Sequence, residues 1–407
     1  MQHGLIKPMG IQSFLQTIVQ NAATWGEGSP SVERGDILER VPPRVFNQLA
    51  EKGRQLPAPE VCKATVQASL TEAIARWQAN PDVENNSLVI LSSPAEDLAT
   101  IFKAVLHGEN TAFEQCNIRF LMQGYQRPAD PLEIKRHIRR EIEKLPDDEP
   151  DTQPTLVVIP HLEQCFLRCI QGWEGVEYLQ NFTTRDSSRF WIVGCNHWAW
   201  TFLDRVCQIS AYLEQPVQLP ELSGEALKSW LLPFFSDVVT VLNLKAADDE
   251  HAFTLEPGAD GYWQSLSNLS SGIGTTATRL WLKSLRLCTG DRESDNGDAG
   301  NGTSDNQDFD DAQSLSLVPI KPALPSAITF NAIDRYLLQS LLIHGETTRD
   351  HLALSLGEAE RKIRDRLQVL KREGIIIQKG RRLSVHPAHY PRLYNELKNN
   401  NFLIGAR

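Results

Sequence analysis

The chain has 407 residues, of which 41% are hydrophobic and 23% charged, and its formal net charge at pH 7 is −10. This length is enough for two or three domains, and the composition excludes a fibrous or wholly disordered chain. No apolar run reaches the length of a membrane span, and the seven scattered cysteines contain no CxxC; we therefore expect no transmembrane segment, reduced thiols, a cytoplasmic location and no metal site.

Residues 1–85 form the first predicted region, which is helical and irregular. Amphipathic stretches over residues 11–19 and 59–79 predict two helices, and the Gly and Pro residues between them mark loops. We recognise no chemistry in this region.

Residues 86–222 predict an α/β domain built on a five-stranded parallel sheet. Short apolar runs alternate with helical segments, and buried parallel strands are typically such continuous apolar runs. The predicted strands are residues 88–91, 118–121, 156–159, 190–193 and 217–219. The helices between them begin near Pro94, Pro131, Glu163 and Trp198. Residues 223–288 then predict a helical lid, with helical stretches over 223–234 and 262–287.

Charge is distributed unevenly over the rest of the chain. We predict an acidic disordered linker over residues 289–325, because residues 290–313 contain eight Asp or Glu, one Arg and a single large apolar residue, Phe309. Residues 325–407 contain fourteen Lys or Arg against eight Asp or Glu, a net charge of +6. This asymmetry favours an anionic partner for the C-terminal part.

The pattern over residues 326–395 predicts a winged-helix domain. Three amphipathic helices, over residues 331–344, 347–356 and 358–373, precede two short strands that flank the KGRR turn at residues 379–382. Residues 396–407 are the predicted tail.

The order of strands and helices over residues 86–288 resembles the P-loop ATPases of the AAA+ and STAND type. The resemblance implies a Gly-rich loop after the first strand, whose backbone and Lys hold phosphate. Here the loop is degenerate: it has no Gly or Lys, Pro94 removes a donor, and Glu96 and Asp97 would repel phosphate. The alternative is an ordinary helix start, with Ser93 and Glu96 as a capping box and Pro94 in the first turn. The degenerate loop positions are Ser92, Ser93, Pro94, Glu96 and Asp97.

The resemblance also implies roles for residues outside this loop. The strand at residues 156–159 would end in an acidic pair that binds magnesium, but only Glu163 is present there, as a base. Asn196 matches the position that senses the γ-phosphate, Arg185 and Arg189 that of an arginine finger, and Arg279 that of a second sensor. Each residue has a structural alternative: helix-dipole complementation for Glu163, a turn for Asn196, and solvated side chains for the arginines.

The C-terminal domain resembles winged helices, whose DNA-binding members insert the third helix into the major groove and contact phosphate with the wing. The helix also carries Glu358, Glu360 and Asp365, which favours the alternative of a protein-docking module. The predicted nucleic-acid-binding residues are Arg361, Lys362, Arg364, Arg366, Lys379, Arg381 and Arg382.

We predict a regulatory or adaptor pseudo-ATPase that binds no cofactor and engages DNA or a protein through its winged helix. One alternative is a weak ATPase or nucleotide switch that uses ATP and Mg²⁺ at an unconventional loop. Another is a scaffold subunit of a membrane-associated complex. A homo-oligomer is a further expectation from the AAA+ resemblance. The acidic linker could cover the basic domain, in which case deleting residues 290–313 raises DNA affinity at low salt.

Overall fold

The computed structural model describes residues 37–108, 113–122, 124–145, 153–213, 216–241, 244–246, 249–251, 253–255, 257–259, 261–289, 315–326 and 328–402. The predicted helix over residues 11–19 and the acidic residues 290–313 lie outside these ranges. No helix of the described part combines the length and apolar character that crossing a bilayer requires.

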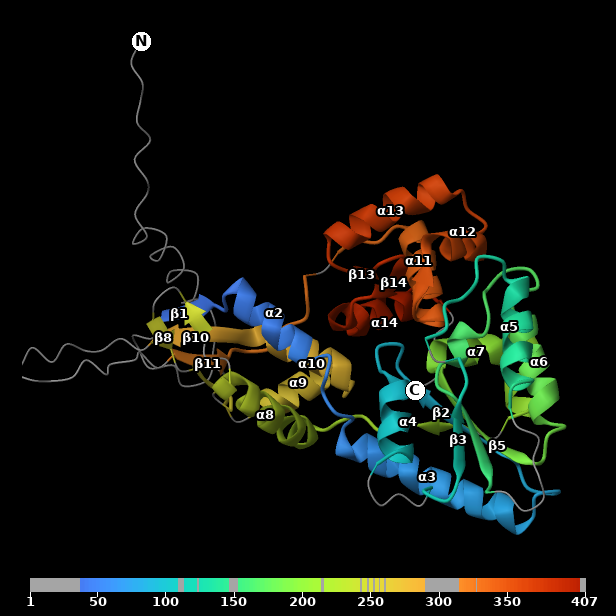
Figure 1. Cartoon of the computed structure of the whole chain (residues 1–407). Helices are drawn as coiled ribbons and strands as arrows, with labels where there is room; N and C mark the ends of the chain where they lie inside the picture. Colours follow the sequence, from blue (N-terminus) through green and yellow to red (C-terminus); the bar gives the residue numbers. More distant parts are fainter. Residues whose placement is uncertain are drawn as a thin grey trace, which may run out of the picture.

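The largest sheet of the described residues has five parallel strands in the order β3-β4-β5-β2-β6. Figure 1 shows this sheet at the lower right. Its strands are β2 (Ser87–Ser92), β3 (Asn117–Phe120), β4 (Thr155–Ile159), β5 (Arg189–Asn196) and β6 (Val217–Gln218). The first of these strands lies between the fourth and the fifth. The predicted fold class is confirmed: the chain has an α/β fold built on a five-stranded parallel sheet.

The two faces of the sheet pack against different helices, because successive strand residues point to opposite sides. On one face Ile90 and Phe190 pack with α3 (Glu60–Ala79) and α4 (Leu98–Leu106). On the other, Val157 and Trp191 pack with α5 (Leu132–Ile142), α6 (Glu174–Thr183) and α7 (His197–Cys207). The amphipathic helix predicted at residues 59–79 is therefore α3, and it covers the sheet (Figure 1).

The region after the sheet contains helices and a small second sheet. Its helices are α8 (Gly224–Val241), α9 (Tyr262–Ser270) and α10 (Gly274–Ser284), with α2 (Pro43–Lys52) beside α10. The sheet has the order β1-β10-β11-β9, formed by Ile37–Arg40, Leu285–Thr289, Leu315–Pro319 and Phe253–Leu255. A separate hairpin joins β7 (Leu244–Ala246) to β8 (Asp249–His251).

Two predictions for this region need correction. The helical stretch over residues 262–287 is two helices and a strand, because Gly272 adopts a φ of +64° between α9 and α10 and a Cβ there would meet Glu221 and Leu222. Residues 315–319, predicted as disordered linker, form β11, in which the apolar Leu317 is 1% exposed and pairs with Leu287 of β10.

The C-terminal part contains three helices, a hairpin and a final helix. The elements are α11 (Ala332–His344), β12 (Thr347–Thr348), α12 (Arg349–Leu356), α13 (Glu360–Arg372), β13 (Ile376–Lys379), β14 (Arg382–Val385), η3 (Pro387–His389) and α14 (Tyr390–Asn399). Leu337, Ile363 and Leu367 form its own core. Residues of α11 and α14, including Ile343 and Tyr390, join the core on the α7 side of the main sheet instead. Residues 396–399, predicted as tail, belong to α14.

Candidate functional site

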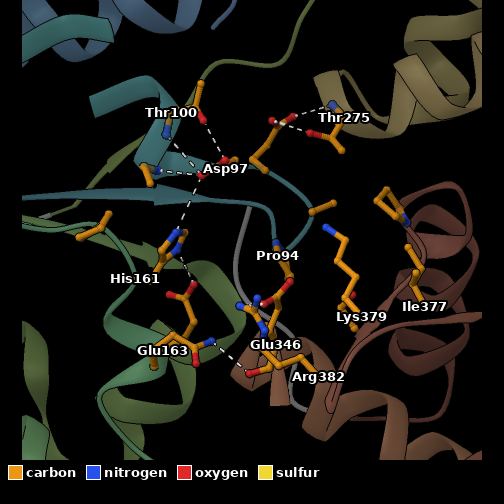
Figure 2. Close-up of a pocket in the computed structure, with 18 of the residues that line it drawn as sticks. Pro94, Asp97, Thr100, His161, Glu163, Thr275, Glu346, Ile377, Lys379 and Arg382 are labelled. Carbon is orange, nitrogen blue, oxygen red and sulfur yellow. Dashed lines mark hydrogen bonds and ion pairs between the residues drawn. The ribbon is translucent and has the colours of Figure 1, made fainter. Parts of the chain in front are cut away.

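A cleft of about 1130 Å³ lies at the carboxyl ends of the sheet strands, where open parallel sheets commonly bind ligands. Its walls come from the loops after β2, β3 and β4, from α10, and from the turn between β13 and β14. Figure 2 shows Pro94 and Asp97 on one side and Lys379 and Arg382 on the other. The loop after β2 and the hairpin of β13 and β14, which are far apart in sequence, thus line one cleft.

The loop after β2 ends in an acidic helix cap. Helix α4 begins at Leu98, and Asp97 Oδ1 accepts hydrogen bonds from the backbone N–H groups of Ala99 (3.1 Å) and Thr100 (3.3 Å) (Figure 2). The predicted capping box of Ser93 and Glu96 is wrong, because these residues lie in a turn before the helix. The N–H groups that a helix N-terminus can offer to phosphate are here bonded to a carboxylate.

Glu96 joins this loop to helix α10. Its carboxylate accepts hydrogen bonds from the backbone N–H (3.3 Å) and the hydroxyl (3.2 Å) of Thr275, at the start of α10. Burial raises the pKa of Glu96, and the hydrogen bonds from Thr275 oppose that shift. The carboxylate therefore fixes α10 against the sheet domain.

Both carboxylate oxygens of Glu163 are engaged within the protein. Glu163 follows β4 in the short helix η1 (Leu162–Gln164), and its Oε1 lies 3.1 Å from His161 Nδ1 (Figure 2). Its Oε2 accepts a hydrogen bond from the backbone N–H of Asn196 at 3.3 Å. Burial lowers the pKa of His161, but the hydrogen bond and charge of Glu163, with the charge of Asp97, raise it above its ordinary value overall.

Asn196 uses its side chain to connect structural elements. Its Oδ1 accepts a hydrogen bond from the N–H of Ala199 at 2.9 Å and so caps α7, while its Nδ2 donates to the backbone oxygen of Ile343 in α11 at 3.2 Å. The residue is 2% exposed. The amide at the expected γ-phosphate sensor position therefore holds the C-terminal part against the sheet.

The adjacent His197 belongs to a hydrogen-bonded chain between the same parts. Its Nδ1 lies 2.9 Å from the carbonyl oxygen of Ser92, and its Nε2 lies 3.0 Å from the hydroxyl of Tyr390. Because a carbonyl only accepts, Nδ1 carries the proton and Nε2 accepts from Tyr390, whose oxygen accepts from Trp198 Nε1 at 3.0 Å. Within the described ranges no three His, Cys, Asp or Glu side chains are grouped as metal ligands.

Of the three arginines implied by the AAA+ resemblance, only Arg279 lines the cleft. Burial, followed by the nearby charge of Arg54, lowers its pKa. Arg189 is the first residue of β5, at the opposite edge of the sheet from the cleft. Its guanidinium forms an ion pair with Asp186 at 2.9 Å. Arg185 is exposed just after α6, close in sequence to that same edge.

The seven predicted nucleic-acid-binding cations divide into paired and unpaired residues. Arg366 makes a two-pronged ion pair with Asp334 of α11, at 2.8 and 2.6 Å, and Asp334 is 1% exposed. Lys362 pairs with Glu358, Arg381 with Asp350 and Arg382 with Glu346. Arg361, Arg364 and Lys379 are exposed and form no ion pair with any described residue.

Sequence reasoning missed several residues that line the cleft or join its walls. The buried Arg127, from the loop after β3, donates through Nη2 to the backbone oxygen of Glu163 at 2.7 Å and through Nη1 to Thr347 Oγ1 at 3.2 Å. Gln164 Nε2 donates to the backbone oxygen of His344 at 2.8 Å. No motif marks these positions, since their partners are distant in sequence.

No family model and no curated protein matches the chain. Solved structures with some similarity include the Saccharomyces cerevisiae Hsp104:casein complex, at 9% identity and a TM-score of 0.35, over 60% of this chain and 37% of that one. The chain thus spans little more than a third of Hsp104. The Aeropyrum pernix ORC1 protein in complex with DNA matches at 12% identity and a TM-score of 0.37, over 85% and 94% of the two chains. The Aeropyrum pernix ORC2 protein matches at 11% identity and a TM-score of 0.38, over 89% of this chain and 98% of that one.

The parallel sheet and the cleft at its strand ends define the class of protein. The chain is an α/β protein with a five-stranded parallel sheet, whose strand ends open into a cleft shared with the C-terminal part.

Proposed function

We propose that the protein is a regulatory or adaptor pseudo-ATPase, in which the AAA+-like core holds a C-terminal winged helix for binding to the phosphate backbone of DNA. The observation that carries the proposal is the engagement of Asn196 and Glu163. Both side chains sit where the resemblance implies nucleotide chemistry, and both are hydrogen-bonded to backbone groups: Glu163 accepts from the N–H of Asn196, and the Asn196 amide bonds to Ala199 and Ile343.

Nucleotide binding would have to break these contacts. A typical intramolecular hydrogen bond contributes about 1 kcal/mol net, and an N-cap about the same. A triphosphate at the loop after β2 would displace the Asp97 cap of α4, meet the negative charge of Asp97, and find no Lys there. The same contacts become useful in an adaptor, because they fix the winged helix on the core.

Calorimetric titration with Mg-ATP tests the first half of the proposal. We expect no heat of binding up to millimolar nucleotide for the protein as it stands. Micromolar binding that Asn196→Ala abolishes would contradict the proposal and favour the alternative of a nucleotide switch.

The DNA half rests on Arg361 and Arg364, which extend into solvent from α13. Affinity that comes from phosphate contacts by such cations falls as the salt concentration rises. The slope of the logarithm of the binding constant against the logarithm of the salt concentration is about −1 for each contact. They carry no sequence information, so we propose binding without strong base preference.

The test is fluorescence anisotropy with a short duplex at several salt concentrations. We expect Arg361→Glu with Arg364→Glu to weaken binding and lower the salt slope by about two. The matched control is Arg185→Glu with Arg205→Glu, which makes the same charge change at other exposed positions. Equal loss in both variants, or no duplex binding by the unaltered protein, would favour protein docking instead.

A further inference from the structure

Arg127 is a buried cation without a carboxylate partner. Arg127 is 7% exposed, and no acidic side chain of the described residues lies within ion-pair distance of its guanidinium. Its printed acceptors are neutral: the backbone oxygens of Glu163 and Glu346 and the hydroxyl of Thr347. Burial lowers the pKa of Arg127 to about 10, so the side chain stays charged at neutral pH.

The two acids whose backbone oxygens Arg127 contacts use their carboxylates elsewhere. Glu163 uses its carboxylate oxygens on His161 and Asn196, and the Glu346 carboxylate pairs with Arg382. A buried charge without a counterion is costly, whereas buried charges in proteins are normally paired. The positive charge of Arg127 therefore calls for an anion from outside the chain.

Unused polar atoms surround this charge. Arg127 Nε and the hydroxyl of Tyr125 are buried and have no hydrogen-bond partner within the described residues, and both side chains line the cleft. The charge of Arg127 reaches the Tyr125 hydroxyl, since it lowers the pKa that burial raises. His344 Nδ1, also influenced by the Arg127 charge, is a third buried atom without a described partner.

All three groups can donate a hydrogen bond. His344 Nε2 accepts from the backbone N–H of Arg168 at 3.2 Å, so the proton of the neutral ring lies on Nδ1. Tyr125 and Arg127 both line the cleft, and their unpartnered O–H and N–H groups suit a ligand that only accepts. Arginine in particular matches the oxygens of phosphate well.

We propose that Arg127 and Tyr125 form a binding site on the cleft floor for a tetrahedral phosphate-type oxyanion, between the sheet domain and β12. The ligand is either free inorganic phosphate or a phosphodiester of a nucleic acid. This site is separate from the degenerate loop and from Arg361 and Arg364, and it does not rest on the proposed function.

The test measures thermal unfolding of the full chain against rising inorganic phosphate, with chloride at matched ionic strength as the reference. The unaltered protein should show a saturable rise in Tm. Tyr125→Phe removes only a hydroxyl that has no described partner, so it should fold equally well without phosphate but bind phosphate about tenfold more weakly. Tyr212→Phe, at a tyrosine that is 46% exposed outside the cleft, is the matched control and should behave like the unaltered protein.

Arg127→Lys supplies a second variant, which keeps the charge but loses the planar fork, and it should also weaken the phosphate effect. A phosphate effect that is absent, or equal in the Tyr125 and Tyr212 variants, overturns the proposal. Adding a short oligonucleotide then shows whether the bound ligand is free phosphate or a phosphodiester of a nucleic acid. Loss of the Tyr125-dependent phosphate effect means that a phosphodiester occupies the site, and its persistence means that free phosphate does.

Discussion

The side-chain amide of Asn196 donates a hydrogen bond to the backbone oxygen of Ile343 at 3.2 Å, which joins the end of β5 to the last turns of α11. A helix leaves its last carbonyl oxygens without partners inside the helix, so this bond satisfies one of them. Asn196 therefore both caps α7 and holds α11 of the C-terminal part against the sheet.

We expect Asn196→Ala to lower the free energy of unfolding by about 2 kcal/mol, because it removes an N-cap and leaves a buried carbonyl oxygen unpaired. Denaturant unfolding followed by circular dichroism measures the change. Asn181→Ala is the control, since the exposed Asn181 amide bonds only to Glu177 in its own helix. Similar losses in both variants would argue against a role for Asn196 in joining the two parts.

The acidic cap of α4 gives a second expectation. Asp97→Ala should lower the free energy of unfolding by about 1 kcal/mol, through loss of the bonds to Ala99 and Thr100. The measurement is the denaturation midpoint, with Asp82→Ala in an exposed turn as the control. Unchanged stability would mean that the N–H groups of α4 do not depend on the carboxylate.

Much of the fold could be predicted from the sequence because it depends on local pattern. Residues 88–91 and 156–159 are continuous apolar runs, and the structure buries every one of them in central strands. The sequence places residues 315–319 in the predicted linker because they directly follow an acidic segment, although their short Leu–Ser–Leu alternation is typical of a strand.

The site could be predicted only in part, since the roles of its residues depend on contacts with partners that are distant in sequence. The position of Asn196 after a strand was visible in the sequence, but its partner Ile343 is 147 residues away. Arg366 looked like an exposed cation because the buried Asp334 that holds it is on another helix. Arg127 carried no signal at all, because nothing in its sequence neighbourhood indicates burial.

The pKa values of His386, the N-cap residue of η3, and of His389, its last residue, predict a loss of stability in mild acid. Burial, followed by the charge of Lys283, lowers the pKa of both His386 and His389 to about 4. An unfolded histidine titrates near 6.5, so between about pH 6.5 and 4 the unfolded chain binds more protons than the folded one. Stability should therefore be fully present above pH 6.5 and fall as the pH drops toward 4.

Denaturant unfolding at pH 7.5, 6.5 and 5.5 measures this dependence. Replacing both histidines with Gln should make the slope of the profile shallower over that range. Part of the slope should remain, because burial also lowers the pKa of His344 and of His351. A double variant with the slope of the unaltered protein would assign the acid sensitivity to other groups.

Arg366 separates a structural role from a nucleic-acid-binding one. Its guanidinium holds the buried Asp334, and removing one partner of a buried ion pair leaves an uncompensated charge, so Arg366→Ala should cost about 3 kcal/mol. Arg364→Ala, at an exposed position on the same helix, should change the free energy of unfolding by less than about 0.5 kcal/mol. Duplex affinity should respond in the opposite order, falling for the Arg364 variant and staying unchanged for Arg366→Ala under conditions where that variant is folded. A stable Arg366→Ala protein with weakened DNA binding would instead place Arg366 in the DNA contact and its ion pair with Asp334 in the free state only.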